Sequence, residues 1–414
     1  EAAGGEVLLD QRVRFGGSHH QKLVVLRHPG APERDVAFAG GIDLCHSRRD
    51  DAQHRGDPQA VQMAPQYGEN PPWHDIQLQI HGPAVGSLDL TFRERWTDPT
   101  PLDTLSPIAW ILDKLRRADL SPGELPPQPA DPPPCGPQAV QVLRTYPDAH
   151  FDFAFAPHGE RSVARGYTKA VRRAKRLIYL EDQYLWSKEV AHLLAEALTA
   201  NPDLHLVAVV PRHPDVDGKF ALPPNKVGRQ QAIETCRQAD PERVHIFDAE
   251  NREGTPVYVH AKVCVIDDVW ACAGSDNFNR RSWTHDSELS CAVLDDTRDE
   301  REPRDPAGRG DGARVFARDL RLRLMREHLD LADDGSEDAG LIDPVSAVQA
   351  VTASAQALQD WYEGGRTGTR PPGRLRPHQP EQLGRSTRLW ALPVYRAIYD
   401  PDGRSYRDRL RRRW

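Results

Sequence analysis

A short motif occurs twice in this chain, about 240 residues apart, and each copy heads an apolar run. The first copy is His20-Gln21-Lys22, followed by Leu-Val-Val-Leu at residues 23–26. The second is His260-Ala261-Lys262, followed by Val-Cys-Val-Ile at residues 263–266. Short apolar runs of this composition are typical of buried strands. A strand motif that repeats at this distance predicts a fold built from two related halves.

Each copy of the motif places an imidazole beside an ammonium group. Side chains two residues apart on a strand point to the same face, so the histidine and lysine of each copy lie together. If the two copies face each other, they form a site with two histidines and two lysines. Such a site suits a phosphate ester, because one histidine can attack phosphorus and the other can protonate the leaving group. The lysines would hold the charged oxygens.

Glycines follow both motifs at matching places. Gly274-Ser275-Asp276-Asn277 follows the second apolar run, and Gly40-Gly41-Ile42-Asp43 follows the first after a longer gap. One His-x-Lys could arise by chance on a surface strand, whereas two copies with matched glycines are specific evidence. We expect Gly40, Gly41, Gly274 and Ser275 to support the site.

Each half also offers a carboxylate at the start of an alternating strand. When the apolar positions of the two strands are aligned, Asp75 lies opposite Glu288. A carboxylate bonded to one ring nitrogen of a histidine fixes the tautomer and the direction of the other nitrogen. We therefore expect Asp75 to orient His20 and Glu288 to orient His260.

These motifs resemble those of the phospholipase D superfamily. The second half fits the pattern His-x-Lys-x4-Asp-x6-Gly-Ser-x-Asn without a gap, with Asp267 at the acidic position and Asn277 at the end. The first half resembles the phosphatidylcholine-cleaving branch. Three stretches carry that resemblance: residues 19–25, 36–44 and 72–75. Residues 179–185 resemble the strand of the same branch that leads into the second half. The similarity runs from about residue 15 to 100 and from about 160 to 295.

The resemblance implies an α/β fold and a reaction. The fold would be a pseudo-twofold duplication with two mixed sheets flanked by helices and the active site between the halves. His20 would attack phosphorus to give a phosphohistidine, and His260 would protonate the departing alcohol. Lys22, Lys262 and Asn277 would stabilise the phosphoryl oxygens. Symmetry alone does not say which histidine attacks. We expect no metal and no other cofactor, because two lysines already supply positive charge.

The first half departs from the family pattern at one position. Where an aspartate is expected five residues after Lys22, the chain has Arg27. The following residues are rich in proline and glycine, which indicates an enlarged turn. We expect the supporting acid to survive across that turn as Glu33 or Asp35.

Proline-rich sequence divides the chain into four parts. We expect a first half at residues 1–120, a linker at 121–140, a second half at 141–335, and a helical extension with a basic tail at 336–414. The linker cannot form helix or sheet because of its prolines. Residues 296–313 are charged and predict a mobile surface loop.

The periodicity of the second half predicts alternating helices and strands. We expect helices at 161–174, 189–200, 315–331 and 345–361, and strands at 177–185, 204–211 and near 244–247. The first half has no counterparts of the elements that precede His260. This asymmetry favours a missing N-terminal portion. Localisation is therefore poorly constrained: a cytoplasmic or peripheral membrane protein is favoured, and secretion is left open.

Composition limits the remaining possibilities. The formal net charge is −7, so the chain is no general nucleic-acid binder. Six cysteines without a Cys-x-x-Cys pair indicate neither a zinc site nor a disulfide framework, and Cys264, Cys272 and Cys291 read as core residues. No stretch approaches 18 apolar residues, so we expect no transmembrane segment.

The substrate is less constrained than the chemistry. We expect the substrate to be a phospholipid at a membrane surface and the protein to be a monomer. Trp186 and Arg280 are candidate substrate contacts. The simpler interpretations are that Trp186 is a core or rim aromatic and that Arg280 forms a local ion pair. The basic tail at residues 404–414 could touch anionic lipid, although a solvated terminus is favoured. A nuclease or other phosphodiesterase of the superfamily and a catalytically impaired scaffold are the alternatives.

Overall fold

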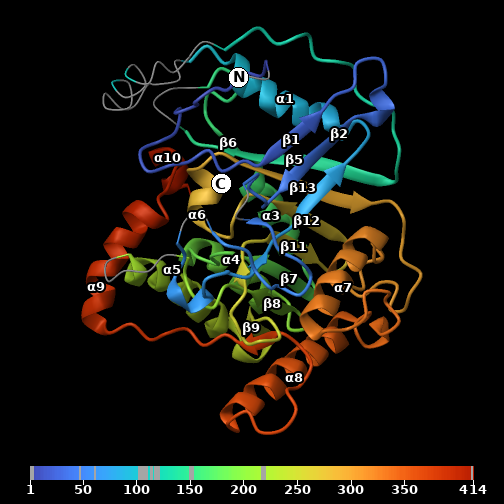
Figure 1. The fold of residues 1–414 in the computed structure, drawn as a ribbon, viewed down its shortest axis with the longest axis vertical. Helices are drawn as coiled ribbons and strands as arrows, with labels where there is room; N and C mark the ends of the chain where they lie inside the picture. The colour runs from blue at the N-terminus through green and yellow to red at the C-terminus, as the bar shows by residue number, and fades with distance from the viewer. Residues whose placement is uncertain are drawn as a thin grey trace.

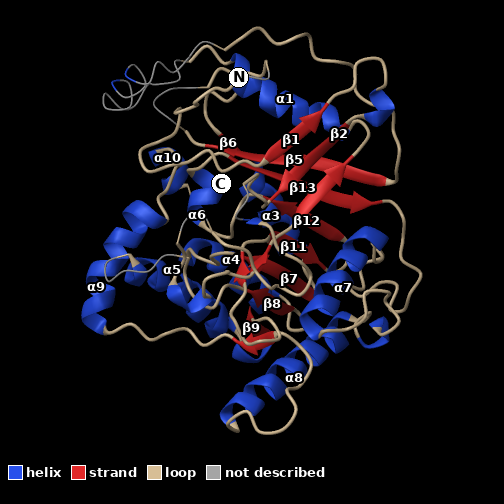
Figure 2. Ribbon diagram, in the orientation of Figure 1, coloured by secondary structure: helices blue, strands red, loops and turns tan. Residues whose placement is uncertain are grey.

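The structure is a computed structural model, and two sheets of unequal size dominate it (Figures 1 and 2). It describes residues 4–45, 48–59, 62–100, 111, 115, 122–148, 153–215, 221–411 and 414. The larger sheet belongs to the second half of the chain. The smaller one belongs to the first half and lies beside it.

Nine strands form the large sheet, in the order β14-β9-β8-β7-β11-β12-β13-β5-β6. Strands β7, β8 and β9 are mutually parallel, and their neighbours on both sides join antiparallel. The bounds are β5 Gln138–Tyr146, β6 Glu160–Arg161, β7 Leu177–Asp182, β8 His205–Val209, β9 Val244–Ala249, β11 Lys262–Ile266, β12 Trp270–Gly274, β13 Glu288–Asp295 and β14 Leu375–Pro377. Every residue of β7 and β11 is buried, as expected for strands covered on both faces.

Helices cover both faces of the large sheet (Figure 2). One hydrophobic cluster joins the sheet to α3, α4 and α5, and a second joins it to α7 and α8. The bounds are α3 Ser162–Arg173, α4 Lys188–Ala200, α5 Leu222–Ala239, α6 Arg280–Thr284, α7 Val315–Leu329, α8 Pro344–Glu363, α9 Arg385–Val394 and α10 Tyr406–Leu410. Among the described residues, no helix is both long and apolar enough to cross a bilayer.

The first half contributes an antiparallel sheet of three strands, in the order β1-β2-β4. Their bounds, with the helix that follows, are β1 Leu23–Leu26, β2 Val36–Gly40, β4 Gln77–Ile80 and α1 Ala84–Thr97. A third hydrophobic cluster joins this sheet to Leu289 and Cys291 of β13. The small sheet is therefore packed on the large one by apolar contact.

A separate two-stranded ribbon joins the halves through the backbone. Strand β3, Trp73–His74, pairs in parallel with β10, Tyr258–Val259. Because the partners are about 185 residues apart, this ribbon fixes the first half against the segment that precedes β11.

The structure confirms the elements predicted for the second half. Helices α3, α4, α7 and α8 and strands β7, β8 and β9 each overlap the expected range, with ends that differ by a few residues. Cys264, Cys272 and Cys291 are buried and unpaired, as expected for core residues. The expected linker ends earlier than predicted, because residues 138–140 already belong to β5.

Two charged segments have fixed contacts beside their exposed residues. The loop at residues 296–313 is irregular and largely at the surface, as expected, but Asp299 within it is 3 % exposed and pairs with the buried Arg318. At the end of the chain, residues 406, 407 and 409–411 are exposed, as expected of a solvated terminus, but Trp414 is anchored. Trp414 contacts the ring of Trp283, and the Arg404 guanidinium lies 4.7 Å above the Trp414 ring. A buried ion pair holds part of the first segment and aromatic contacts hold the end of the second, and composition alone does not indicate such contacts.

A buried carboxylate anchors α7 to the hairpin that follows Lys262. Asp268 is 1 % exposed and bonds Arg318 and Arg321, which are fully buried. Asp268→Asn keeps the shape and tolerates the positive φ at this turn, but it leaves the buried Arg321 without an anion and Arg318 with Asp299 alone. We expect the free energy of unfolding, measured by urea denaturation, to fall by about 3–5 kcal/mol.

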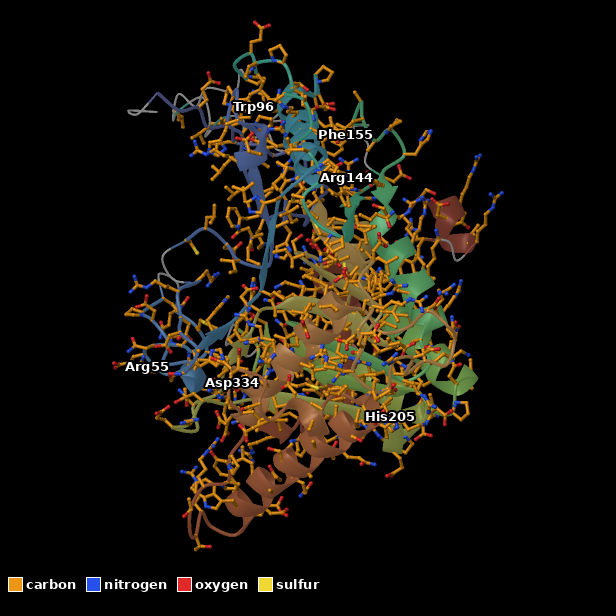
Figure 3. All side chains as sticks on the ribbon, turned by 90° about the vertical axis from the view of Figure 1, so that its right-hand side faces the viewer. Arg55, Trp96, Arg144, Phe155, His205 and Asp334 are labelled. Carbon is orange, nitrogen blue, oxygen red and sulfur yellow. The ribbon has the colours of Figure 1, made fainter. Side chains whose placement is uncertain are left out.

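The matched control is Asp334→Asn on the surface (Figure 3), which we expect to change that free energy by less than about 0.5 kcal/mol. If Asp268→Asn unfolds at the same urea concentration as the parent, the anchor does not contribute as described.

Candidate active site

The two motif histidines lie just before β1 and β11, and each is held by the backbone of the opposite half. The His20 amide donates to the Ser287 carbonyl at 2.9 Å, and the His260 amide donates to the His74 carbonyl at 2.8 Å. The motifs therefore meet at the junction of the halves, as the duplication predicted.

The carboxylates are crossed between the halves. His20 Nδ1 lies 2.9 Å from Glu288 Oε2, and His260 Nδ1 lies 2.7 Å from Asp75 Oδ2. The expectation that each carboxylate orients the histidine of its own half is therefore wrong. The reason lies in strand pairing: β3 runs beside β10, and His19 bridges to Ser287, so each carboxylate strand lies against the other half's histidine. Sequence alignment of the two halves finds equivalent residues but not their partners.

Hydrogen bonds hold both carboxylates in place. The Ser275 hydroxyl donates to Glu288 Oε2 at 2.5 Å, which places Ser275 directly beside that carboxylate. Asp75 accepts from the Trp73 indole at 3.3 Å and from the Ile76 amide at 2.9 Å. Burial disfavours the charge of Asp75, but His260, Lys262 and the Ile76 amide outweigh it and lower the pKa of Asp75 to about 2.

The motif glycines permit close packing around these groups. A Cβ on Gly41 would lie 2.1 Å from an oxygen of Asp75, and one on Gly274 would lie 1.7 Å from the Ser290 hydroxyl. A Cβ on Gly40 would meet the Ile76 carbonyl at 2.4 Å. Each glycine is thus required by the approach of a neighbouring strand.

Each lysine is tethered to the histidine of its own motif. Lys22 Nζ donates to the His20 carbonyl at 2.8 Å, and Lys262 Nζ donates to the His260 carbonyl. Lys22 also pairs with Asp43 at 3.2 Å, and Lys262 donates to Gln183 at 3.1 Å.

Asp43 and Gln183 were not among the predicted site residues. The repeat contained a signal for Asp43, because it lies three residues after Gly40 as Asn277 lies three after Gly274. Burial disfavours its charge, but Lys22 and His260 lower the pKa of Asp43.

Burial and like charge set the protonation of the second motif. Burial lowers the pKa of His260 to about 4, with Lys262 acting in the same direction. Burial also lowers the pKa of Lys262 to about 8. Lys22, from the first half, contributes to both shifts, so the two halves share one electrostatic field. At neutral pH the free protein holds His260 neutral and Lys262 largely protonated.

A pocket of about 550 Å³ opens beside His20. Its lining includes Ser18, His20, Tyr184, Trp186, Asn225, Asn277, Arg281, Asp286 and Tyr399. Trp186, a candidate substrate contact, is in the wall and stacks on Tyr184 with ring centroids 4.0 Å apart. Asn277 is 2 % exposed, and its side-chain oxygen has no partner within the described part of the chain.

Arg280 does not line this pocket, contrary to the prediction. Its guanidinium donates to the Asp400 carbonyl at 3.1 Å and lies 4.0 Å from the Asp400 carboxylate. Arg280 thus forms the local ion pair that was the simpler interpretation. The neighbouring Arg281 takes the place in the wall and pairs with Asp286 at 2.7 Å.

The acid displaced by Arg27 is Asp35. Asp267, at the family position in the second half, accepts three backbone amides, from residues 175, 176 and 177. Asp35 is 2 % exposed, accepts the His28 amide at 2.6 Å and pairs with Arg27 at 3.0 Å. Glu33 is exposed and does not support the strand. The enlarged turn thus keeps a buried acid and adds a cation beside it.

Three histidines and two glutamates form a buried cluster behind Asp75. His74 Nε2 lies 2.6 Å from Glu181 and its Nδ1 lies 2.9 Å from Glu327. His54 joins Glu327 at 2.8 Å, and His328 joins Glu181 at 2.8 Å. These are hydrogen-bond distances, and both nitrogens of His74 face carboxylates.

Burial disfavours an imidazolium here, but Glu181 and Glu327 outweigh it and raise the pKa of His74 well above its usual value. The same side chains are close enough together to hold a metal ion if the protons were displaced. As arranged, the cluster locks the residue next to Asp75 by charge-assisted hydrogen bonds between the halves.

Comparison with known proteins matches both halves. A family model described as phospholipase D matches residues 6–109, and one described as cardiolipin synthase, PLD-like domain, matches residues 167–300. Phospholipase D alpha 2 of Oryza sativa subsp. japonica is 25 % identical over 481 residues, which cover 90 % of this chain and 56 % of the relative. The chain thus spans about half the length of this relative.

Two solved structures are similar to parts of the chain. Phosphatidylserine synthase of Haemophilus influenzae is 14 % identical, with a TM-score of 0.36, over 54 % of this chain and 51 % of its own. Nuc of Salmonella typhimurium is 16 % identical, with a TM-score of 0.28, over 38 % of this chain and 84 % of its own.

The fold and the site define a duplicated α/β protein with two His-x-Lys motifs that meet between its halves. The chain belongs to the phospholipase D superfamily. The resemblance of the motifs and the predicted fold class are thereby confirmed.

The crossed pairing predicts which histidine responds to the loss of each carboxylate. In Asp75→Asn, we expect the side-chain nitrogen shifts of His260 to change and those of His20 to stay. In Glu288→Gln, the opposite holds, because each isosteric change removes the anion bonded to one Nδ1. Two-dimensional NMR of imidazole ¹⁵N measures this directly.

Glu234→Gln, an exposed change on α5, is the control and leaves both histidines unchanged. A shift of His20 alone in Asp75→Asn would show that the carboxylates are not crossed.

Proposed function

We propose that the chain is a phosphodiesterase that cleaves glycerophospholipids such as phosphatidylcholine through a phosphohistidine, with water or an alcohol as acceptor. The supporting observation is the pair of crossed dyads, in which each imidazole has Nδ1 on a carboxylate. Within the described residues, neither Nε2 has a hydrogen-bond partner, so both are available for chemistry.

In the first step, His20 Nε2 attacks phosphorus and the bond from phosphorus to the leaving alcohol oxygen breaks. His260 gives its Nε2 proton to that oxygen. In the second step, His260 takes a proton from water or an alcohol, whose oxygen attacks phosphorus. The bond from phosphorus to His20 then breaks, and the enzyme returns to its starting state.

Accessibility supports His20 as the nucleophile. Its side chain is 26 % exposed and lines the pocket, whereas that of His260 is 6 % exposed. His260 must be protonated to act as the acid, although its pKa is about 4 in the free protein. A bound phosphodiester carries a negative charge that favours the imidazolium, so substrate binding itself would load the acid.

Lys22, Lys262 and Asn277 supply the groups that stabilise the phosphoryl oxygens. Both ammonium groups are already fixed by hydrogen bonds, so little reorganisation is needed in the transition state. Asn277 offers an amide N–H from the pocket wall. Together they place positive charge where the reaction accumulates negative charge.

The pocket wall and the relatives favour a lipid over a nucleic acid. Stacked Tyr184 and Trp186 beside His20 suit the methylated head group of choline or the interface of a lipid. A nucleic-acid substrate would favour a cationic groove, and the net charge is −7. An inactive scaffold would not need two complete dyads and two positioned lysines.

Incubation with phosphatidylcholine vesicles and a primary alcohol tests the proposal. We expect free choline, with phosphatidic acid and a phosphatidyl alcohol as products. His20→Asn and His260→Asn should each lower turnover by about 10³-fold or more, because each removes a group that transfers a proton or attacks phosphorus.

His192→Asn, at an exposed position of α4, should leave turnover unchanged. Full turnover by either motif variant would overturn the mechanism. Cleavage of single-stranded DNA without choline release would identify the nuclease alternative.

The pKa of Lys262 predicts an alkaline limit to activity. The ammonium form binds phosphoryl oxygens, and its pKa is lowered to about 8 by burial. Hence kcat/KM should fall as the pH rises through about 8, measured with a soluble phosphodiester. Activity that stays constant well above this pH would show that Lys262 is not required as a cation.

A further inference from the structure

We propose that four exposed apolar side chains around the mouth of the pocket form a lipid-docking surface. We call Phe15, Leu389, Trp390 and Ile398 the apolar rim. The inference rests on the proposed function and deepens it, because it specifies how a membrane lipid reaches His20.

The rim residues are large apolar side chains with much of their surface in contact with solvent. Phe15 is fully exposed, Leu389 is 81 % exposed, Ile398 is 58 % exposed and Trp390 is 39 % exposed. A soluble protein does not gain by presenting several large apolar groups together, so a cluster of them marks an interaction site.

A tight turn presents Phe15. The Gly17 amide donates to the Arg14 carbonyl at 2.8 Å, and Gly16 has a φ of +72°. Glycine at this place permits a turn with Phe15 at its tip. Arg14 fastens the turn by donating to the Gly403 carbonyl at 2.7 Å.

Arg281 joins this turn to the C-terminal segment at the pocket mouth. Its guanidinium donates to the Gly16 carbonyl at 3.1 Å, the Tyr399 carbonyl at 3.2 Å and the Ile398 carbonyl at 3.4 Å. Arg281 and Tyr399 both line the pocket that contains His20. The backbone segments that carry Phe15 and Ile398 are therefore held next to each other beside a pocket-lining arginine, although they are far apart in the sequence.

Helix α9 connects the rim to the pocket wall. Its inner side packs Ala391 in one cluster with Trp186 and Tyr395, and its outer side presents Leu389 and Trp390. Figure 1 shows α9 at the outer edge of the molecule, beside α5. A membrane that touched the outer side of α9 would therefore be separated by this one helix from Tyr184 and Trp186 in the pocket wall.

The charges around the rim favour a lipid surface over a protein or a second copy. Residues 382–399 contain three arginines and neither aspartate nor glutamate, and Arg385 and Arg396 are exposed. Apolar side chains with tryptophan and flanking arginines are the composition of interfacial segments, which insert into the head-group region and contact anionic lipid. A nucleic acid would instead favour cationic side chains around the mouth of the pocket, because its phosphates dominate binding.

The test is Phe15→Ser with Ile398→Ser, compared with Leu294→Ser. Leu294 is 43 % exposed and lies at the end of β13 opposite Glu288, about 20 Å along the strand. Co-sedimentation with vesicles of phosphatidylcholine and phosphatidylglycerol measures docking, in the His260→Asn background so that the lipid is not consumed. We expect the rim pair to weaken binding by about tenfold or more and the control to leave it unchanged.

A second measurement separates docking from chemistry. With His260 intact, the rim pair should lose turnover of vesicle lipid by a similar factor and keep turnover of bis(4-nitrophenyl) phosphate, which needs no surface. Unchanged vesicle binding, or equal loss on both substrates, would overturn the docking surface.

A parent protein that self-associates in sedimentation equilibrium but does not bind vesicles, and that becomes monomeric in the rim pair, would assign the rim to a second copy. That result would overturn the proposal. If the parent turned over neither substrate, the proposed function would fail, while vesicle binding by the His260→Asn protein would still decide the docking surface.

Discussion

The site depends on two short backbone contacts between the halves. The His74 carbonyl receives the His260 amide, and the Ser287 carbonyl receives the His20 amide. In each contact the next residue along the strand is the carboxylate that binds the histidine's ring. One backbone bond therefore fixes both the histidine and its partner. Because the contacts are reciprocal, neither half contains a complete dyad, and the chemistry exists only when both are docked.

Charged side chains are buried around this junction, and the free energy needed to remove them from water explains why so many of them are paired. An isolated buried charge is strongly unfavourable, whereas a paired and hydrogen-bonded one is tolerated. His74 lies between Glu181 and Glu327, and Asp75 beside it stays ionised against His260. In general, polar groups that are held in place and shielded from water before a substrate binds stabilise developing negative charge more strongly than solvated groups do. Burial also lowers the pKa of His260 to about 4.

The C-terminal segment belongs to the site although neither family model extends beyond residue 300. Strand β14 adds an edge to the large sheet, and Tyr395 and Tyr399 pack with Trp186 near the pocket. Arg281 links this segment to the turn at Gly16. Residues outside both family matches therefore help to shape the pocket beside His20, while the matched segments hold the two His-x-Lys motifs.

The sequence alone determined the duplication, the two His-x-Lys pairs, the glycines beside them and the helices and strands of the second half, because these follow from periodicity and local spacing. It also located Asp75 and Glu288, but not which histidine each one serves. Only the tertiary structure decided that, together with the choice of Asp35 over Glu33 and of Arg281 over Arg280. The physical reason is common to all three. A side chain's partner is set by which distant segment packs beside it, and contacts between distant segments leave no trace in local pattern.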